Sequence, residues 1–118
     1  MRLDFANYPM LIKLNANSNY DLVLFSSCYS EEKQFPDILG REIFLFDKND
    51  KMIWQIDAPQ GVARIFDEFI GEYVSQPYDW YFSGLRVRDR KYLAERFDGD
   101  VFELDIATGK ATYVYWTK

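Results

Sequence analysis

Histidine is absent from this 118-residue sequence, and cysteine occurs once, at Cys28. Without histidine the chain has no Ser-His-Asp or Cys-His catalytic arrangement, and it lacks the commonest protein ligand of transition metals. A single cysteine makes neither an internal disulfide nor a structural zinc site. Because Cys28 ends an apolar run, we expect its thiol to be buried and structural. We expect no metal site and no catalytic site of these kinds.

Long apolar runs and clustered glycines are missing as well. No apolar stretch approaches the about 18 residues of a transmembrane helix, and the N-terminal sequence has no apolar run of the signal-peptide kind. The six glycines stand too far apart for a phosphate-binding loop. These absences predict a cytoplasmic protein with no catalytic residues, no cofactor and no membrane segment.

Acidic residues outnumber basic ones, at 19 against 14, which gives a net charge of -5 at pH 7. This charge disfavours direct binding of nucleic acid, because nucleic-acid phosphates are negative. It favours encounter with a basic protein. Aromatic residues make up 19% of the chain, which is ample core material for a single domain spanning residues 1–118.

The first half of the chain has the pattern of two antiparallel hairpins. Apolar runs at residues 10–14 and 20–25 flank an Asn-rich turn, and a second pair of runs lies at residues 43–46 and 51–56. The run at 43–46 is apolar at four successive positions, which predicts a strand buried on both faces.

The last part of the chain, from residue 79, is predicted to form a meander of up to four strands that ends in a hairpin turning at Thr108-Gly109. Residues 101–116 resemble the outer strand pair of a β-propeller blade, a resemblance that implies local structure only. The sequence at 101–105 also echoes that at 43–47, so a duplicated four-stranded unit is one interpretation.

Between these two halves the apolar period changes. Apolar residues recur at a helical spacing at Val62, Ile65, Phe66, Phe69, Ile70 and Tyr73. This spacing predicts an amphipathic helix over about residues 62–75, with acidic side chains on its polar face. The predicted fold class is therefore α+β, a predominantly antiparallel β meander of about 7–8 strands with one central amphipathic helix.

Carboxylates and large aromatic rings remain as candidate binding groups. Paired acids can supply acid–base chemistry or ligands for a hard cation, although Asp at a turn commonly bonds to its own backbone. The candidate partner-binding residues combine the acids of the predicted helix with two rings and two acids near the last meander. They are Asp67, Glu68, Glu72, Tyr78, Trp80, Asp98 and Asp100.

A small, acidic, Tyr- and Trp-rich chain without catalytic equipment resembles the bacterial immunity proteins of toxin–immunity systems, such as those of contact-dependent growth inhibition. The resemblance implies a tight complex with a cognate toxin, a basic protein such as a nuclease, whose active site the immunity protein covers. Two alternatives stay open. One is a non-catalytic protein-binding or structural subunit, and the other is a carboxylate-based enzyme or small-ligand-binding domain. The oligomeric state is also left open.

Overall fold

The computed structural model describes residues 5–28 and 30–117, and in these residues all ten strands pair in antiparallel fashion. A short 3-10 helix spans Phe5–Asn7. The strands are β1 (Met10–Asn17), β2 (Tyr20–Phe25), β3 (Ile43–Asp47), β4 (Met52–Gln55), β5 (Val62–Asp67), β6 (Glu72–Pro77), β7 (Phe82–Arg88), β8 (Lys91–Arg96), β9 (Asp100–Leu104) and β10 (Ala111–Trp116). None of the described residues belongs to a helix with the length and apolar character of a membrane span.

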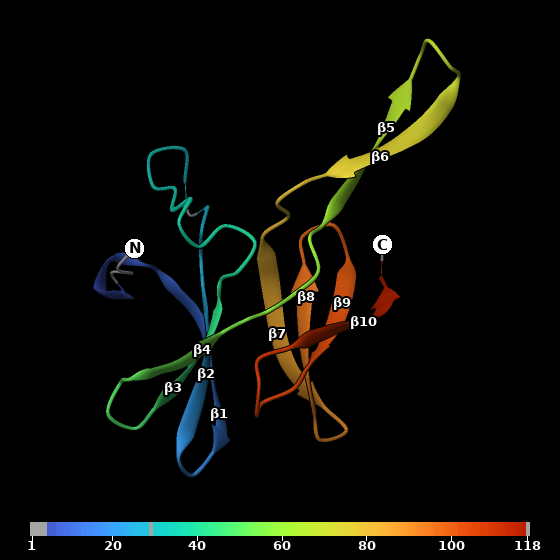
Figure 1. Ribbon diagram of the computed structural model, residues 1–118. Coiled ribbons are helices and arrows are strands. Elements are labelled where there is room, and N and C mark those ends of the chain that lie inside the picture. Colours follow the sequence, from blue (N-terminus) through green and yellow to red (C-terminus); the bar gives the residue numbers. More distant parts are fainter. Residues whose placement is uncertain (1–4, 29, 118) are drawn as a thin grey trace.

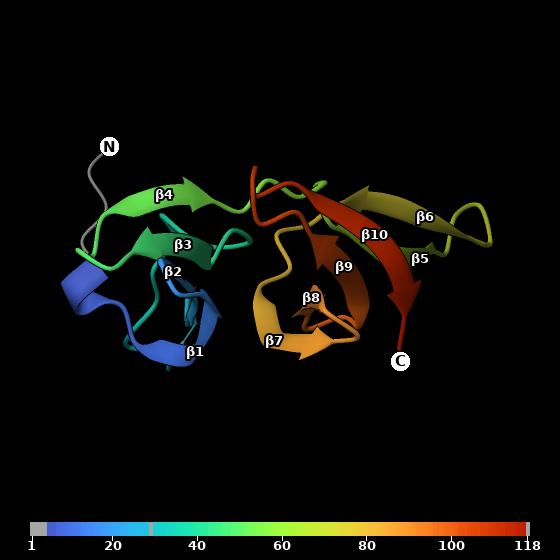
Figure 2. The ribbon, with the colours of Figure 1, turned by 90° about the horizontal axis from the view of Figure 1, so that it is seen from below.

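Two four-stranded meanders form the body of the molecule. The first sheet has the order β1-β2-β3-β4 and the second β10-β9-β8-β7. Figure 2 shows the two sheets next to each other when the molecule is seen from below. Strands β5 and β6 form a separate two-stranded hairpin, which projects from the body in Figure 1. This hairpin, residues 62–77, is called the arm.

The main core lies between the two sheets. It is built from Leu22, Leu24, Ile43, Leu45, Trp54, Ile56, Phe82, Leu85, Ala94, Phe102, Leu104 and Ala111. Strand β3 contributes to both faces of its sheet, because Ile43 and Leu45 join this core while Phe44 and Phe46 join an aromatic cluster on the opposite face. The prediction that residues 43–46 form a doubly buried strand is confirmed.

The outer faces of the two sheets are closed in different ways. On the first sheet, an aromatic cluster packs under the N-terminal segment and the loop before β3, with Tyr8 and Ile38 buried in it. On the second sheet, charged side chains pair across strands, as in the Arg86–Glu95 contact at 3.9 Å. Single apolar side chains of the body, such as Leu11, Ile53 and Val87, are still about half exposed.

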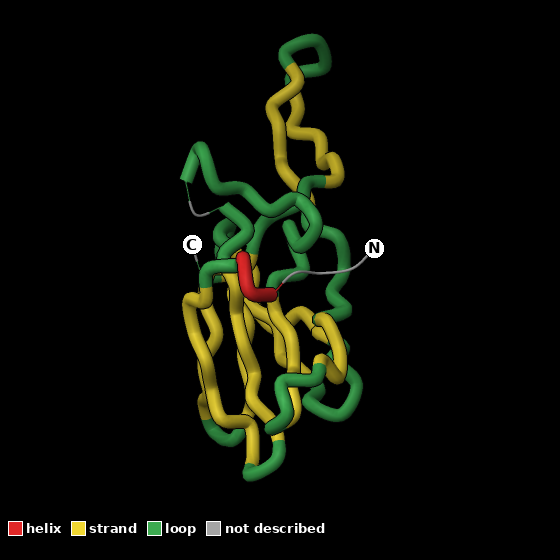
Figure 3. Tube along the Cα trace, turned by 90° about the vertical axis from the view of Figure 1, so that its left-hand side faces the viewer, coloured by secondary structure: helices red, strands yellow, loops and turns green. Residues whose placement is uncertain are grey.

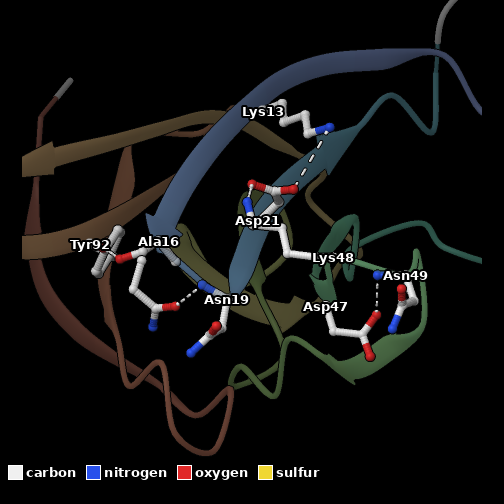
Figure 4. A network of polar contacts seen from close by, with 9 residues as sticks. Lys13, Ala16, Asn19, Asp21, Asp47, Lys48, Asn49 and Tyr92 are labelled. Carbon is white, nitrogen blue, oxygen red and sulfur yellow. Dashed lines mark hydrogen bonds and ion pairs between the residues drawn. The ribbon is translucent and has the colours of Figure 1, made fainter.

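Polar contacts join the sheets and brace their turns (Figure 4). The Tyr92 hydroxyl on β8 donates to the backbone carbonyl of Ala16 on β1 at 2.6 Å, which ties the second sheet to the first. Within the first sheet, the Asp21 carboxylate accepts from Lys48 at 3.1 Å and lies 3.8 Å from Lys13. Since the lysines are about half exposed, these ion pairs add little to stability.

The turn of the last hairpin docks against the end of β4. Trp54 donates its indole N–H to the Ile106 carbonyl at 2.8 Å, and its ring lies directly against Gly109. The Asp57 N–H donates to the Gly109 carbonyl at 2.9 Å, and the Ala111 N–H donates to the Asp57 carbonyl at 2.8 Å. The predicted hairpin is confirmed, and its turn is a second junction between the two halves.

The predicted helix over residues 62–75, and with it the α+β class, is wrong, because this segment forms the arm. The Asp67 side chain accepts the Phe69 N–H, and Gly71 has a φ of 68° and donates to the Asp67 carbonyl, which closes a hairpin turn. The β-branched and aromatic residues that supplied the helical spacing also favour strands. The fold of the described residues is thus nearly all β.

Candidate functional site

Among the described residues, the arm is the most exposed apolar element. Figure 3 shows it projecting from the body. Phe69, in its turn, is fully exposed at 101%, and Tyr73 is 72% exposed. The other exposed apolar residues of the arm are Val62, Ile65, Phe66, Ile70 and Val74. An isolated two-stranded hairpin is marginally stable in water, and exposed apolar surface of this kind commonly marks a contact with another molecule.

Three carboxylates gather at the tip of the arm. Asp67 and Glu72 are direct cross-strand partners, and Glu68 lies in the turn between them. Like charges directly opposite each other on a hairpin destabilise it. The only basic residue of the arm is Arg64, and it makes no ion pair of 4.0 Å or less within the described part of the chain. The tip therefore presents unneutralised negative charge beside exposed apolar side chains.

A cleft of about 510 Å³ opens where the base of the arm meets β9 and β10. We call it the basal cleft. Its lining residues are Val62, Ala63, Arg64, Trp80, Asp98, Asp100, Tyr113 and Trp116. It combines aromatic rings with two carboxylates, and one wall belongs to the arm itself.

Two backbone hydrogen bonds fix the indole rings of the basal cleft. The Trp80 indole N–H donates to the Val62 backbone carbonyl at 3.0 Å, and the Trp116 indole N–H donates to the Asp98 backbone carbonyl at 2.8 Å. Trp80 also contacts the Tyr78 ring, with centroids 4.5 Å apart. Both indole donors are thereby used within the chain, so the rings offer the cleft aromatic surface rather than hydrogen-bond donors.

The two aspartates of the basal cleft influence each other. The Asp98 side chain accepts the Asp100 N–H at 3.1 Å, which fixes the turn between β8 and β9. Burial raises the pKa of Asp100, the nearby charge of Asp98 raises it further, and Arg96 and Arg64 oppose the shift. A cation entering the cleft would relieve the repulsion between these carboxylates.

The residues predicted from the sequence fall at two places. Trp80, Asp98 and Asp100 line the basal cleft, and the Tyr78 ring contacts that of Trp80 at a tilted angle. The acidic residues Asp67, Glu68 and Glu72 lie at the opposite end of the arm. They belong to a hairpin tip instead of the polar face of a helix.

Three further residues belong to these sites, of which the sequence indicates Tyr113 and Trp116 only as surplus aromatic rings and does not indicate Arg64. Arg64, Tyr113 and Trp116 complete the lining of the basal cleft. In β10 only Ala111 is buried, and Tyr113 and Trp116 are both exposed. The pairing of β10 with β9 shifts between Tyr113 and Tyr115. Aromatic residues in the last strand were the signal by which Tyr113 and Trp116 could be found. Their proximity to Arg64 depends on where the arm lies relative to β10.

Cys28 and the carboxylate of the β3–β4 turn lie at the surface of the body. Cys28 is exposed, so the expectation of a buried thiol is wrong. Asp47 accepts the backbone N–H groups of Asn49 and Lys51 and thereby closes the β3–β4 turn. The described residues contain no group of three or more potential metal ligands among His, Cys, Asp and Glu.

Two ionisable residues are buried at the junction of the sheets. Glu42 is 0% exposed, and it accepts hydrogen bonds from the Ser27 hydroxyl and from the Phe82 N–H. Arg96 lies between the Phe82 and Phe102 rings, 4.9 Å from each centroid, and donates to a backbone carbonyl. Burial raises the pKa of Glu42 and lowers that of Arg96. Both groups brace the body and lie outside the basal cleft's lining.

The raised pKa of Glu42 predicts a specific pH dependence of stability. A carboxyl that holds its proton more tightly when folded stabilises the protein below its unfolded pKa, near 4.5, and loses that contribution as the pH rises through the folded pKa. Glu42→Gln keeps an acceptor for the Phe82 N–H and cannot ionise. We expect the variant's free energy of unfolding, relative to the wild type, to rise between pH 4 and 7.

Urea titrations of both proteins at several pH values measure this difference. Contributions from all other carboxyls cancel in the comparison, provided that the variant keeps the same structure. A difference that stays constant, or that falls with pH, would contradict the assignment of a raised pKa to Glu42.

Comparison with protein-family models, with curated proteins and with solved structures found no match to this chain.

Proposed function

We propose that this protein is a non-catalytic, cytoplasmic immunity protein that neutralises a basic toxin, such as a nuclease, by inserting the arm into the toxin's active-site cleft. The observation that carries the proposal is the arm itself, with the fully exposed Phe69 and three carboxylates at one tip. An arm of this kind is a suitable inhibitory element because it projects from a body whose own core is already closed.

Apolar and electrostatic contributions act together at the tip. Burial of Phe69 and Ile70 against a partner would gain about 1.5–3 kcal/mol for each side chain that becomes fully buried. The basic residues of a nuclease active site hold the phosphates of the substrate. In the complex they would pair with Glu68 and Glu72 instead of with those phosphates. The repulsion between Asp67 and Glu72 would fall in the complex.

The dimensions of the arm fit this mechanism. Each of its strands has six residues, which at about 3.3 Å per residue gives a reach of about 20 Å. A two-stranded hairpin is narrow enough to enter a substrate groove. Its net acidic charge and the chain's charge of -5 would speed association with a basic partner at low ionic strength.

The test is co-expression with the product of the adjacent gene, followed by size-exclusion chromatography and a growth assay. We expect the product to be toxic alone, and to be harmless and bound in the presence of this protein. A neighbouring product that is harmless by itself, or that stays toxic and unbound, would contradict the immunity function.

Arm variants separate this mechanism from a contact made elsewhere. Glu68→Lys with Glu72→Lys should weaken the complex by about 10- to 100-fold at low salt, since two attractive contacts become repulsive. The control is Glu31→Lys with Glu32→Lys in the exposed loop before β3. It adds the same four charges, so an equal loss of affinity in both proteins would point to net charge instead of the arm.

Phe69→Ala tests the apolar part of the contact. Because Phe69 is fully exposed in the free protein, we expect the free energy of unfolding to change by less than about 0.5 kcal/mol. Affinity for the toxin should fall by about tenfold or more, as for a buried interface residue. Unchanged affinity, measured by isothermal titration calorimetry, would place the contact away from the tip.

A further inference from the structure

The basal cleft is rich in groups that attract a cation. Asp98 and Asp100 supply carboxylate oxygens, and the rings of Trp80, Trp116 and Tyr113 line the same space of about 510 Å³. The two indole N–H groups donate to backbone carbonyls. What remains to an incoming group is therefore aromatic surface and negatively charged acceptors.

Arg64 is the one basic side chain in the lining of the cleft, and it leaves the carboxylates available. It is exposed, and no ion pair of 4.0 Å or less joins it to Asp98 or Asp100 in the described residues. Within the lining, two acids face one base, and buried Arg96, which lies outside the lining, offsets part of their negative charge. Arg64 would compete with any other cation that entered.

We propose that the basal cleft binds the side chain of an arginine from the partner protein. A guanidinium is planar, stacks on aromatic rings and donates several hydrogen bonds in a fixed fork, which suits a space lined by both rings and carboxylates. The ammonium of lysine is a strongly hydrated point charge and fits such a space less well. The proposal rests on the proposed function only for the source of the arginine, a basic protein held by the arm.

The position of the cleft gives this contact a role in recognition. Val62, Ala63 and Arg64 form one wall and also begin the arm, while Asp98 and Asp100 belong to the body. An arginine seated there would contact both parts at once. It would therefore fix the direction of the arm relative to the body when the partner is bound.

The test uses Nα-acetyl-L-arginine methylamide as the probe, with the purified protein and nuclear magnetic resonance at constant ionic strength. We expect saturable shifts of the Trp80 and Trp116 indole signals, with a dissociation constant of about 1–10 mM. The Trp54 indole serves as an internal reference, because it is buried and bonded to Ile106 at the other junction. The corresponding lysine derivative should bind several-fold more weakly.

Two variants should change the affinity in opposite directions. Asp98→Asn with Asp100→Asn keeps a side-chain acceptor for the turn but removes both charges, and should weaken binding of the probe at least about tenfold. Arg64→Ala removes the competing cation and should strengthen binding. Glu31→Gln with Asp37→Asn, in the loop before β3, is the charge-matched control and should bind as the wild type does.

The proposal is overturned if the probe leaves the Trp80 and Trp116 signals unmoved, or if it shifts all three indoles alike. It is also overturned if the double asparagine variant, with a native spectrum, binds the probe as tightly as the wild type. The wild-type spectrum decides the matter even if that variant does not fold. Since no toxin is present, failure here would leave the arm's proposed function standing, and the co-expression test would remain separate.

Discussion

Replacing Gly109 with alanine should lower the free energy of unfolding by about 3–4 kcal/mol, because two costs coincide at this position. Gly109 has a φ of 81°, a backbone conformation that disfavours any side chain. A Cβ placed there would lie 2.6 Å from Cδ2 of the Trp54 ring. That ring is fixed by its bond to Ile106 and by core contacts, so it has little room to retreat.

Gly40→Ala is a matched control for the backbone cost. Gly40 has nearly the same φ, 82°, but an added Cβ would meet its nearest neighbour, the Trp80 carbonyl oxygen, at an ordinary 3.8 Å. We expect this variant to lose only about 1–2 kcal/mol. Thermal or urea unfolding measures both values, and equal losses would show that the contact with Trp54 is unimportant.

The second large effect is expected at Arg96. Arg96→Ala should cost about 3–5 kcal/mol, since it empties the space between Phe82 and Phe102 and removes the donor to the Pro59 carbonyl. It also leaves the buried carboxyl of Glu42 without the nearest buried cation. Pro59 lies in the segment that leads into the arm, so local order there should fall as well.

Arg96→Met distinguishes packing from charge. Methionine fills much of the space taken by the arginine stem, and should recover about half of the loss if packing dominates. The urea concentration at the unfolding midpoint reports the stability of each variant, provided that the slope of the unfolding free energy against urea is unchanged. A loss below about 1 kcal/mol in the alanine variant would mean that Arg96 contributes little to the junction.

The sequence allowed most of the two meanders to be predicted, because their signals are local. Alternating apolar residues and short turns such as Asp98-Gly99 define strands whichever sheet they join. The doubly buried β3 could be recognised from four apolar residues in succession. The packing of one meander on the other depends on long-range contacts, such as Tyr92 with Ala16, that no local pattern contains.

The arm was mispredicted because its apolar spacing suits a helix, while its β-branched and aromatic residues also favour strands. The spacing of Ile65, Phe66 and Phe69 suits one face of a helix, but a helix with that face needs an apolar surface to cover it. In the structure the segment leaves the body, and Gly71 takes the positive φ that a hairpin turn requires. The period alone could not show that these residues would remain uncovered.

For the candidate sites as well, local features could be predicted from the sequence and long-range contacts could not. Trp80 and the paired aspartates could be selected from the sequence as a ring and two acids near turns. Their proximity to Arg64 could not be predicted, because it depends on the base of the arm lying beside β9 and β10. The acidic residues of the tip were selected for the correct charge and the wrong element.

The separation of the arm from the body has a consequence for how this protein can change over generations. Among the described residues, the two apolar clusters of the body include none from the arm, so substitutions from Phe66 to Tyr73 alter what the arm presents without altering what holds the sheets together. Substitutions at the arm's tip could therefore accumulate step by step while the rest of the chain stayed constant. Selection for binding and selection for folding would then act on different residues.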